Sequence, residues 1–250
     1  MTLRIGIIGL GVMGADHANI IYSKTAHASI KAIYDKNIIR AKKISKLLGD
    51  VEIKNSPDEV ITSSNIDAIL IASPDHTHFE LTLKCLKQKK HVLCEKPLST
   101  NIKECMKLIE EEEKIGKRLI QVGFMRRFDP AYLEMKNNFN SKKFGEGLIF
   151  HCIHRCFAAP NYFKSVMTLT NALVHEFDIS RWLLNTEITE LQIIKSKVRK
   201  NLSFNDPLIA IMKCKNGVIV DAECTMTSNY GYDVKSELVC DKGTILMTPQ

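Results

Sequence analysis

The sequence predicts an α/β Rossmann domain, built on a doubly wound parallel sheet, followed by an α+β domain with an open, mainly antiparallel sheet. Up to about residue 123, short apolar runs alternate with helical patterns, as in a parallel sheet with crossover helices. A glycine-rich turn follows the first run directly. Beyond residue 123 the runs become longer and alternate apolar with polar residues, which is typical of antiparallel strands. We therefore expect two domains, residues 1–123 and 124–250.

In the first domain, apolar runs predict the strands and end signals predict the helices. The expected strands cover residues 5–8, 30–34, 68–72, 91–94 and 119–122. Ser56 is placed as a helix N-cap, with Pro57 at the first helical position. Thr100 is expected to open a helix that Gly116 closes.

In the second domain, longer runs predict strands and one segment predicts a helix. The expected strands lie near residues 147–156, 188–198, 207–214, 217–227 and 233–240, and the helix lies near 171–184. Asn216 and Gly217 suit the positive φ angles of a tight hairpin, and residues 241–243 repeat this signal further on.

Composition limits the class of protein. Hydrophobic residues at 45% and charged residues at 25% match an average soluble protein. No apolar run is long enough to span a bilayer and no export signal opens the chain, so we expect a cytoplasmic protein without a membrane partner. The eight scattered cysteines are expected to be buried reduced thiols. The net charge of +7 arises from dispersed basic residues, so no nucleic-acid partner is expected.

The glycine-rich turn is the strongest functional signal, because it follows an apolar strand and opens a helix. Gly9 permits the tight turn, Gly11 lets the backbone approach a pyrophosphate, and Gly14 lets helix and strand pack closely. Free N–H groups at the helix start attract the anion. A plain strand-to-helix turn is the alternative. The expected cofactor contacts here are Gly9, Gly11, Val12, Met13 and Gly14.

Asp35 ends the second predicted strand and indicates which dinucleotide binds. An acidic side chain at this place hydrogen-bonds the adenosine ribose hydroxyls and repels a 2′-phosphate, which favours NAD over NADP. The alternative is an Asp that only forms a turn or caps the next helix. The neighbouring Lys36 would soften the discrimination.

Two loops follow strands four and five at the carboxyl edge, where open parallel sheets bind ligands. Ser73 and Pro74 lie in the first loop, and Glu95, Lys96 and Pro97 in the second. We expect the nicotinamide there. A positioned lysine can donate to a substrate hydroxyl or steady an alkoxide.

Several motifs together resemble the glucose-fructose oxidoreductase and inositol dehydrogenase family, most closely its inositol 2-dehydrogenases. The motifs are the glycine turn, Pro74 to His78, Glu95-Lys96-Pro97, Gln121 to Arg127, His175 to Asp178 and Tyr230 to Asp233. The resemblance implies that Lys96 is catalytic, that Pro97 follows a cis peptide, and that the chain forms a homodimer or homotetramer. It also implies that family members continue beyond residue 250, so a C-terminally shortened second domain is expected.

The resemblance further implies the site residues. Cofactor contacts are expected from Ser73, Pro74, His78, Glu95 and Lys96, and substrate contacts from Arg126, His154, Asp178 and Tyr232.

The helix predicted at 171–184 contains a candidate proton acceptor, because the spacing of its polar residues places a histidine and an aspartate on one face. Asn171, His175, Asp178 and Trp182 are four, three and four residues apart and therefore share one helix face. A histidine near neutral pKa suits acceptance of a hydroxyl proton, and an aspartate one turn away can orient it. A polar helix face turned to water is the alternative.

Two positions depart from the family pattern. Asn171 stands where the family has an aspartate, and an amide cannot stabilise a positive imidazole or carry a proton. Cys156 stands where inositol dehydrogenases tend to have Asn after His-Arg. Activity is therefore expected to be reduced, or the substrate to differ.

The run His151, Cys152, His154, Cys156 raises a zinc hypothesis, which strand geometry opposes. At about 3.3 Å per residue, the two cysteines stand roughly 13 Å apart, too far to share an ion at bonds near 2.3 Å. His151 also faces the opposite side of the sheet from the other three. No metal is expected.

The sequence thus predicts an NAD-dependent oxidoreductase that oxidises a secondary ring alcohol of an inositol or related cyclic polyol or sugar to the ketone. Its expected catalytic residues are Lys96, His175 and Asn171. The alternative is an NAD-binding protein with weak or no turnover, such as a degenerate or truncated dehydrogenase or a sensor. The particular polyol and the hydroxyl that reacts remain open at this point.

Overall fold

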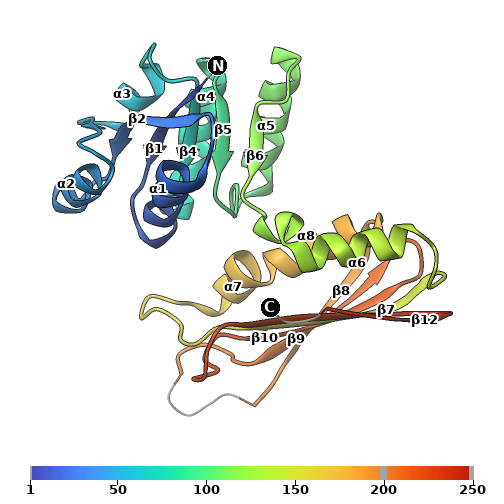
Figure 1. Ribbon diagram of the computed structural model, residues 1–250. Helices are drawn as coiled ribbons and strands as arrows, with labels where there is room; N and C mark the ends of the chain where they lie inside the picture. Colours follow the sequence, from blue (N-terminus) through green and yellow to red (C-terminus); the bar gives the residue numbers. More distant parts are fainter. Residues whose placement is uncertain (1, 198–201, 248–250) are drawn as a thin grey trace. The chain divides into compact units, whose positions relative to one another are not determined.

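The structure is a computed structural model that describes residues 2–197 and 202–247. The chain divides into two compact units, residues 1–123 and 124–250 (Figure 1). Among the described residues, no helix is both long and apolar enough to cross a membrane.

Unit 1 is a Rossmann-like domain around a six-stranded parallel sheet with strand order β3-β2-β1-β4-β5-β6. Its strands are β1 (Leu3–Ile8), β2 (Ala28–Tyr34), β3 (Glu52–Ile53), β4 (Ala68–Ile71), β5 (His91–Cys94) and β6 (Ile120–Val122). Its helices are α1 (Val12–Lys24), α2 (Ile38–Leu47), α3 (Pro57–Thr62), the short η1 (Asp75–Thr77), α4 (His78–Lys87) and α5 (Ile102–Ile115). The predicted parallel sheet is confirmed. Strand β3 was not predicted, because two residues leave no apolar run.

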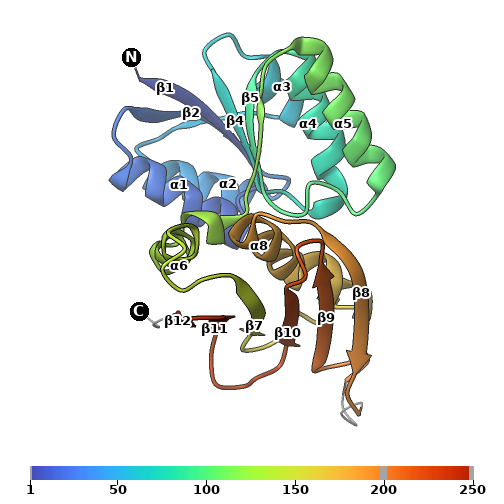
Figure 2. The ribbon, with the colours of Figure 1, turned by 90° about the vertical axis from the view of Figure 1, so that its right-hand side faces the viewer.

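Helices cover both faces of this sheet because side chains alternate along each strand. Ile5 and Ile7 of β1 belong to one core cluster, with residues of α1 and α2. Ile8 belongs to another cluster, with residues of α3 and α4 (Figure 2). The core therefore holds the carboxyl ends of the strands in fixed positions.

Local signals set the helix ends. Ser56 caps α3, because its Oγ accepts from the backbone N–H of Glu59 at 3.2 Å. Gly116 ends α5 with φ 71°, as predicted. Thr100 does not open α5. The cap is Asn101, whose Oδ1 accepts the N–H two residues later, so the helix starts one residue further along.

Unit 2 contains a six-stranded mixed sheet with order β12-β11-β7-β10-β9-β8 (Figure 2). Its strands are β7 (Gly147–Arg155), β8 (Ile188–Lys195), β9 (Leu208–Cys214), β10 (Ile219–Thr225), β11 (Asp233–Cys240) and β12 (Gly243–Leu246). The sheet is mainly antiparallel, as predicted, but β7 and β10 pair in parallel. Strand β8 ends at residue 195, and residue 198 of the predicted strand lies outside the described residues.

The helices of unit 2 contribute to the core on one face of this sheet. They are η2 (Met125–Phe128), α6 (Pro130–Asn140), α7 (Ser165–Met167), the π-helical η3 (Thr168–Ala172) and α8 (Val174–Leu184). Tyr132 of α6, Ile179 of α8 and Phe150 of β7 share the buried core. The predicted helix 171–184 begins only at Val174. Asn171 lies in the π-helical segment, so it does not share the regular α-helical spacing of His175.

Candidate active site

The glycine turn of unit 1 leaves a helix start open for an anion. Gly9 has φ 91°, and a Cβ there would lie 2.5 Å from the backbone nitrogen of Ser73. A Cβ on Gly14 would lie 1.9 Å from the Gly9 carbonyl oxygen, so α1 packs directly on the turn. By contrast, a Cβ on Gly11 would meet nothing within 4 Å. Gly11 is the N-cap of α1 and provides no side-chain cap, so the helix-start N–H groups suit a pyrophosphate.

Asp35 lies directly after β2 and is held on both oxygens. Its Oδ2 accepts from the N–H of Leu10 at 2.7 Å, and its Oδ1 accepts from the N–H of Asn37 at 2.7 Å. Arg40 of α2 lies 3.2 Å from Oδ2 and is half-exposed. The carboxylate is thus fixed beside the glycine turn, where a ribose would bind. Arg40, to which the sequence analysis assigned no role, thus pairs with Asp35.

The loops after β4 and β5 are tied together by His78. Its ring nitrogens lie 2.8 Å from the Ser73 carbonyl oxygen and 2.7 Å from the Pro97 carbonyl oxygen. The side chain is buried, so we interpret His78 as a residue that positions these loops rather than one that touches a cofactor. Ser73 Oγ is within 2.6 Å of Thr77 Oγ1, at the start of the loop that also contains Pro74.

Glu95 and Lys96 stand at the carboxyl end of β5. The peptide between Lys96 and Pro97 is cis, as the resemblance implied. Glu95 Oε1 lies 2.7 Å from Nε2 of His17 on α1. Burial raises the pKa of Glu95, but the hydrogen bond and charge of His17, together with the backbone N–H and charge of Lys96, outweigh burial, so the pKa lies below its ordinary value. The carboxylate that precedes Lys96 is therefore charged and fixed.

In unit 2, Arg126, Glu176 and His154 form a buried cluster. Arg126 Nη1 donates to Glu176 Oε1, and Glu176 Oε2 lies 3.1 Å from His154 Nδ1. All three side chains are buried. Burial raises the pKa of Glu176, but the charge of Arg126 and the hydrogen bond to His154 lower it below its ordinary value. Glu176 therefore accepts only, so Nδ1 of His154 donates to it, and in the neutral imidazole Nε2 is then an acceptor.

His175 adjoins this cluster. It is buried, and its ring centroid lies 6.1 Å from that of His154 and 6.4 Å from that of Phe124. Tyr232, which is exposed, lies 5.8 Å from the His154 ring. Two imidazoles, one guanidinium and one phenol thus gather in one region of unit 2, a set that can bind hydroxyls and take up a proton.

Asp178 is buried on α8 and pairs with Arg127 of η2. Arg127 Nε and Nη2 donate to the two carboxylate oxygens at 2.8 and 2.5 Å. From the sequence, Asp178 was expected to contact the substrate and to orient His175. Its carboxylate is bound by Arg127, a residue to which the sequence analysis assigned no role.

The two departures from the family pattern lie in this unit. Asn171 Oδ1 accepts from Thr170 Oγ1 at 2.6 Å. Cys156 Sγ lies 3.6 Å from Nε2 of His154. The Cys156 thiol therefore lies beside a ring nitrogen of His154. The sequence alone could identify Cys156 only as a departure from the family pattern.

Glu176 and His17 were missed by the sequence reasoning. Glu176 sits about 100° around the helix from His175, so the single-face pattern left it out. Its signal was an acidic residue inside an apolar helical stretch. The partner of His17 is 78 residues away along the chain, and no local pattern indicates such a contact.

The sheet places the residues of the zinc hypothesis on two faces. Cys152 and His154 are buried, while His151 lies on the opposite face and contacts Asp221 at 2.5 Å, as predicted from strand alternation. Within residues 2–197 and 202–247, no group of three or more His, Cys, Asp or Glu side chains is placed to hold a metal ion.

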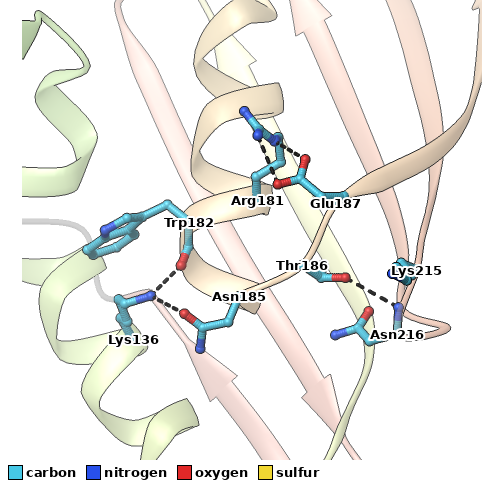
Figure 3. A pocket seen from close by; sticks show the side chains of 8 residues that line it. All are labelled: Lys136, Arg181, Trp182, Asn185, Thr186, Glu187, Lys215 and Asn216. Carbon is cyan, nitrogen blue, oxygen red and sulfur yellow. Dashed lines mark hydrogen bonds and ion pairs between the residues drawn. The ribbon is translucent and has the colours of Figure 1, made fainter. Parts of the chain in front are cut away.

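A pocket of 720 Å³ opens elsewhere in unit 2, at the C-terminal end of α8 (Figure 3). Arg181 pairs with Glu187 through hydrogen bonds of 2.6 and 2.9 Å, and Lys136 donates to Asn185 Oδ1 at 2.8 Å. No predicted site residue lines it, so it is separate from the chemistry described above. Its lining residues are Lys136, Arg181, Trp182, Asn185, Thr186, Glu187, Lys215 and Asn216.

An open helix start beside an anchored acidic residue, followed by a unit with a buried imidazole cluster, defines a dinucleotide-dependent oxidoreductase. Residues 3–124 match the family model described as "Oxidoreductase family, NAD-binding Rossmann fold", and residues 132–246 match the GFO/IDH/MocA C-terminal domain. The chain belongs to this GFO/IDH/MocA oxidoreductase family, and it is an NAD-dependent enzyme of that class. The resemblance inferred from its motifs is confirmed.

Individual relatives agree with this assignment. The chain is 39% identical to inositol 2-dehydrogenase 1 of Saccharopolyspora erythraea, over 98% of this chain and 74% of the relative. It is 40% identical to inositol 2-dehydrogenase of Mycolicibacterium smegmatis, over 98% of this chain and 72% of the relative. Its structure is similar to that of myo-inositol dehydrogenase from Lactobacillus casei in complex with NAD(H) and myo-inositol. That similarity has a TM-score of 0.94 and 26% identity, and it covers 100% of this chain and 75% of the other.

Proposed function

We propose that this chain oxidises a secondary ring alcohol of an inositol or closely related cyclic polyol to the ketone, with NAD as hydride acceptor. The observation that carries the proposal is the buried cluster around His175 in a chain whose relatives are named inositol 2-dehydrogenases. The cluster offers several donors and acceptors to a ligand with many hydroxyls.

In unit 1, the glycine turn and Asp35 would hold the cofactor. The space beside Gly11 and the helix-start N–H groups of Val12 and Met13 suit the pyrophosphate, and Asp35 suits the ribose hydroxyls. When bound, NAD supplies the carbon that accepts the hydride. The loop residues Ser73, Pro74, Glu95 and Lys96 would contact the nicotinamide end.

Two side chains would act on the reacting hydroxyl. His175 accepts its proton, and Lys96 donates a hydrogen bond to the oxygen while negative charge develops there. Glu95, which is charged and fixed by His17, keeps Lys96 beside a compensating carboxylate. Asn171 lies ahead of His175 on the chain and supplies an amide rather than a charge.

The other hydroxyls of the ring would be held by the buried cluster. Arg126 has two guanidinium nitrogens, Nε and Nη2, with no hydrogen-bond partner among the described residues, and these suit hydroxyl oxygens. His154 and Tyr232 add further polar atoms on the same side. Each oxygen of Asp178 keeps a lone pair beyond its bond to Arg127 and can accept from a hydroxyl.

We also propose a cytoplasmic homodimer or homotetramer. The face of the second sheet opposite its core carries partly exposed isoleucines, of which Ile194, Ile209 and Ile219 are at least 40% exposed. All eight cysteines are free thiols, which fits a reducing compartment. Light scattering coupled to size exclusion tests the oligomer, and a monomer at micromolar concentration would contradict it.

The catalytic proposal is tested by NADH formation from a panel of inositols and hexoses. Wild-type protein is expected to reduce NAD with at least one inositol, and His175→Gln and Lys96→Met are expected to lose most of that rate. Both variants should still bind NADH, since the glycine turn is untouched. Protein that binds NADH but reduces no NAD between pH 7 and 10 would refute the proposal.

A further inference from the structure

Cys156, His154 and Glu176 form a linked chain of polar groups in unit 2. Cys156 Sγ lies 3.6 Å from His154 Nε2, and His154 Nδ1 lies 3.1 Å from Glu176 Oε2. From this arrangement we infer that Cys156 is a nucleophilic thiol and a modification site for small soft electrophiles, such as haloacetyl compounds.

The direction of each hydrogen bond follows from the carboxylate. Glu176 is buried and ion-paired with Arg126, so it is charged and can only accept. It therefore accepts a hydrogen bond from the Nδ1–H of His154, which in the neutral imidazole leaves Nε2 as the acceptor that faces the thiol. The S–H of Cys156 donates to Nε2, and a thiolate formed there leaves an imidazolium that Glu176 stabilises.

Atoms and electrons are conserved in the alkylation step. The thiol proton passes to Nε2 of His154, and the thiolate attacks the methylene carbon of iodoacetamide. A carbon–sulfur bond forms as the carbon–iodine bond breaks, and iodide leaves. No oxidant or reductant is required.

The other cysteines have different surroundings. Six of the eight are buried, and burial raises the pKa of Cys152 and Cys224 on the neighbouring strands. Cys105 is the other half-buried cysteine. Its Sγ donates to the Ser99 carbonyl oxygen at 3.8 Å, and burial is the largest of the effects that together raise its pKa above the ordinary value. Cys105 is therefore an internal control of similar exposure.

A second observation indicates that a ligand with an oxygen acceptor fits beside this thiol. Arg126 is 4% exposed, and its Nε and Nη2 have no hydrogen-bond partner among the described residues. Arg126 and His154 bind the two oxygens of the same carboxylate, Glu176, and His154 Nε2 lies 3.6 Å from the thiol, so the guanidinium and the thiol belong to one polar cluster. A carbonyl or carboxylate oxygen on the electrophile can accept from Arg126 while the adjacent carbon meets the thiol.

The test measures alkylation of native protein by iodoacetamide at pH 7, with peptide mass mapping of each cysteine. Trypsin cleaves after Arg155 and so separates Cys156 from Cys152. Cys156 is expected to react at least tenfold faster than Cys105, and His154→Gln is expected to bring its rate down to that of Cys105. Cys156→Ser serves as the control for peptide assignment.

A Cys156 rate equal to or below that of Cys105 in the wild-type protein would overturn the inference, and this comparison needs no folded variant. A fast rate that persists in a folded His154→Gln variant would overturn it equally. The mass readout does not depend on turnover. The inference therefore stands or falls separately from the proposed polyol oxidation.

Discussion

Replacing Asp35 by serine is expected to weaken the preference for NAD over NADP by about 30-fold. A carboxylate and a phosphate charge 4 Å apart repel each other by ~1 kcal/mol in water and by ~4 kcal/mol at an effective dielectric of 20. The Asp35 side chain is 8% exposed, but its partner Arg40 is 46% exposed, so the site lies between these limits. We take about 2 kcal/mol, which corresponds to roughly 30-fold in relative affinity.

The same substitution releases Arg40, which lies 3.2 Å from the carboxylate and would then be available to a 2′-phosphate. The assay compares dissociation constants for NADH and NADPH by the fluorescence of the reduced nicotinamide. Arg40→Gln is the matched control and is expected to keep or increase the NAD preference. A ratio of the two constants that stays within twofold of wild type in Asp35→Ser would refute the reasoning.

Four further substitutions have defined outcomes. Gly14→Ala places a methyl 1.9 Å from a backbone carbonyl oxygen and should lower the free energy of unfolding, measured by thermal unfolding, by about 3 kcal/mol. A methyl on Gly11 meets nothing within 4 Å, so Gly11→Ala should unfold like the wild-type protein but bind NADH more weakly. Asn171→Asp should raise the apparent pKa of the pH–rate profile, because a nearby carboxylate favours the charged imidazole of His175. An unchanged profile would contradict this. Glu176→Gln leaves a buried guanidinium unpaired and should cost about 3–5 kcal/mol in denaturant unfolding at pH 7. The pKa of Glu176 is lowered in the folded protein, so the charged carboxylate stabilises the fold fully above the ordinary glutamate pKa of about 4.3. This stabilisation is lost as the pH falls below that value. The unfolding free energies of the wild-type protein and Glu176→Gln should therefore converge in acid.

Much of the first unit could be predicted because its signals are local. The strands, the cap at Ser56 and the turn at Gly9 each depend on residues a few positions apart. The two-residue strand β3 was not predicted because it leaves no apolar run, and the cap at Asn101 was missed because propensity signals do not fix boundaries to one residue.

The buried cluster of Arg126, Glu176 and His154 in unit 2 was harder to predict, because its contacts join residues far apart in the sequence. Glu176 reaches Arg126 across 50 residues and His154 across 22, and neither spacing leaves a periodic pattern. Asp178 was expected beside His175, yet the bidentate contact with Arg127 determines where its carboxylate lies. The π-helical segment also moved Asn171 off the predicted helix face.

Transfer of isotope from ring carbon to nicotinamide tests the central claim most directly. Inositol with deuterium on every ring carbon would be incubated with NAD and the wild-type chain, and the reduced cofactor would be analysed by mass spectrometry. The expected product is NADH that carries one deuterium at the nicotinamide ring, and His175→Gln should form it at only a small fraction of the wild-type rate. Reduced cofactor without deuterium, or no reduced cofactor from protein that binds NADH, would contradict it.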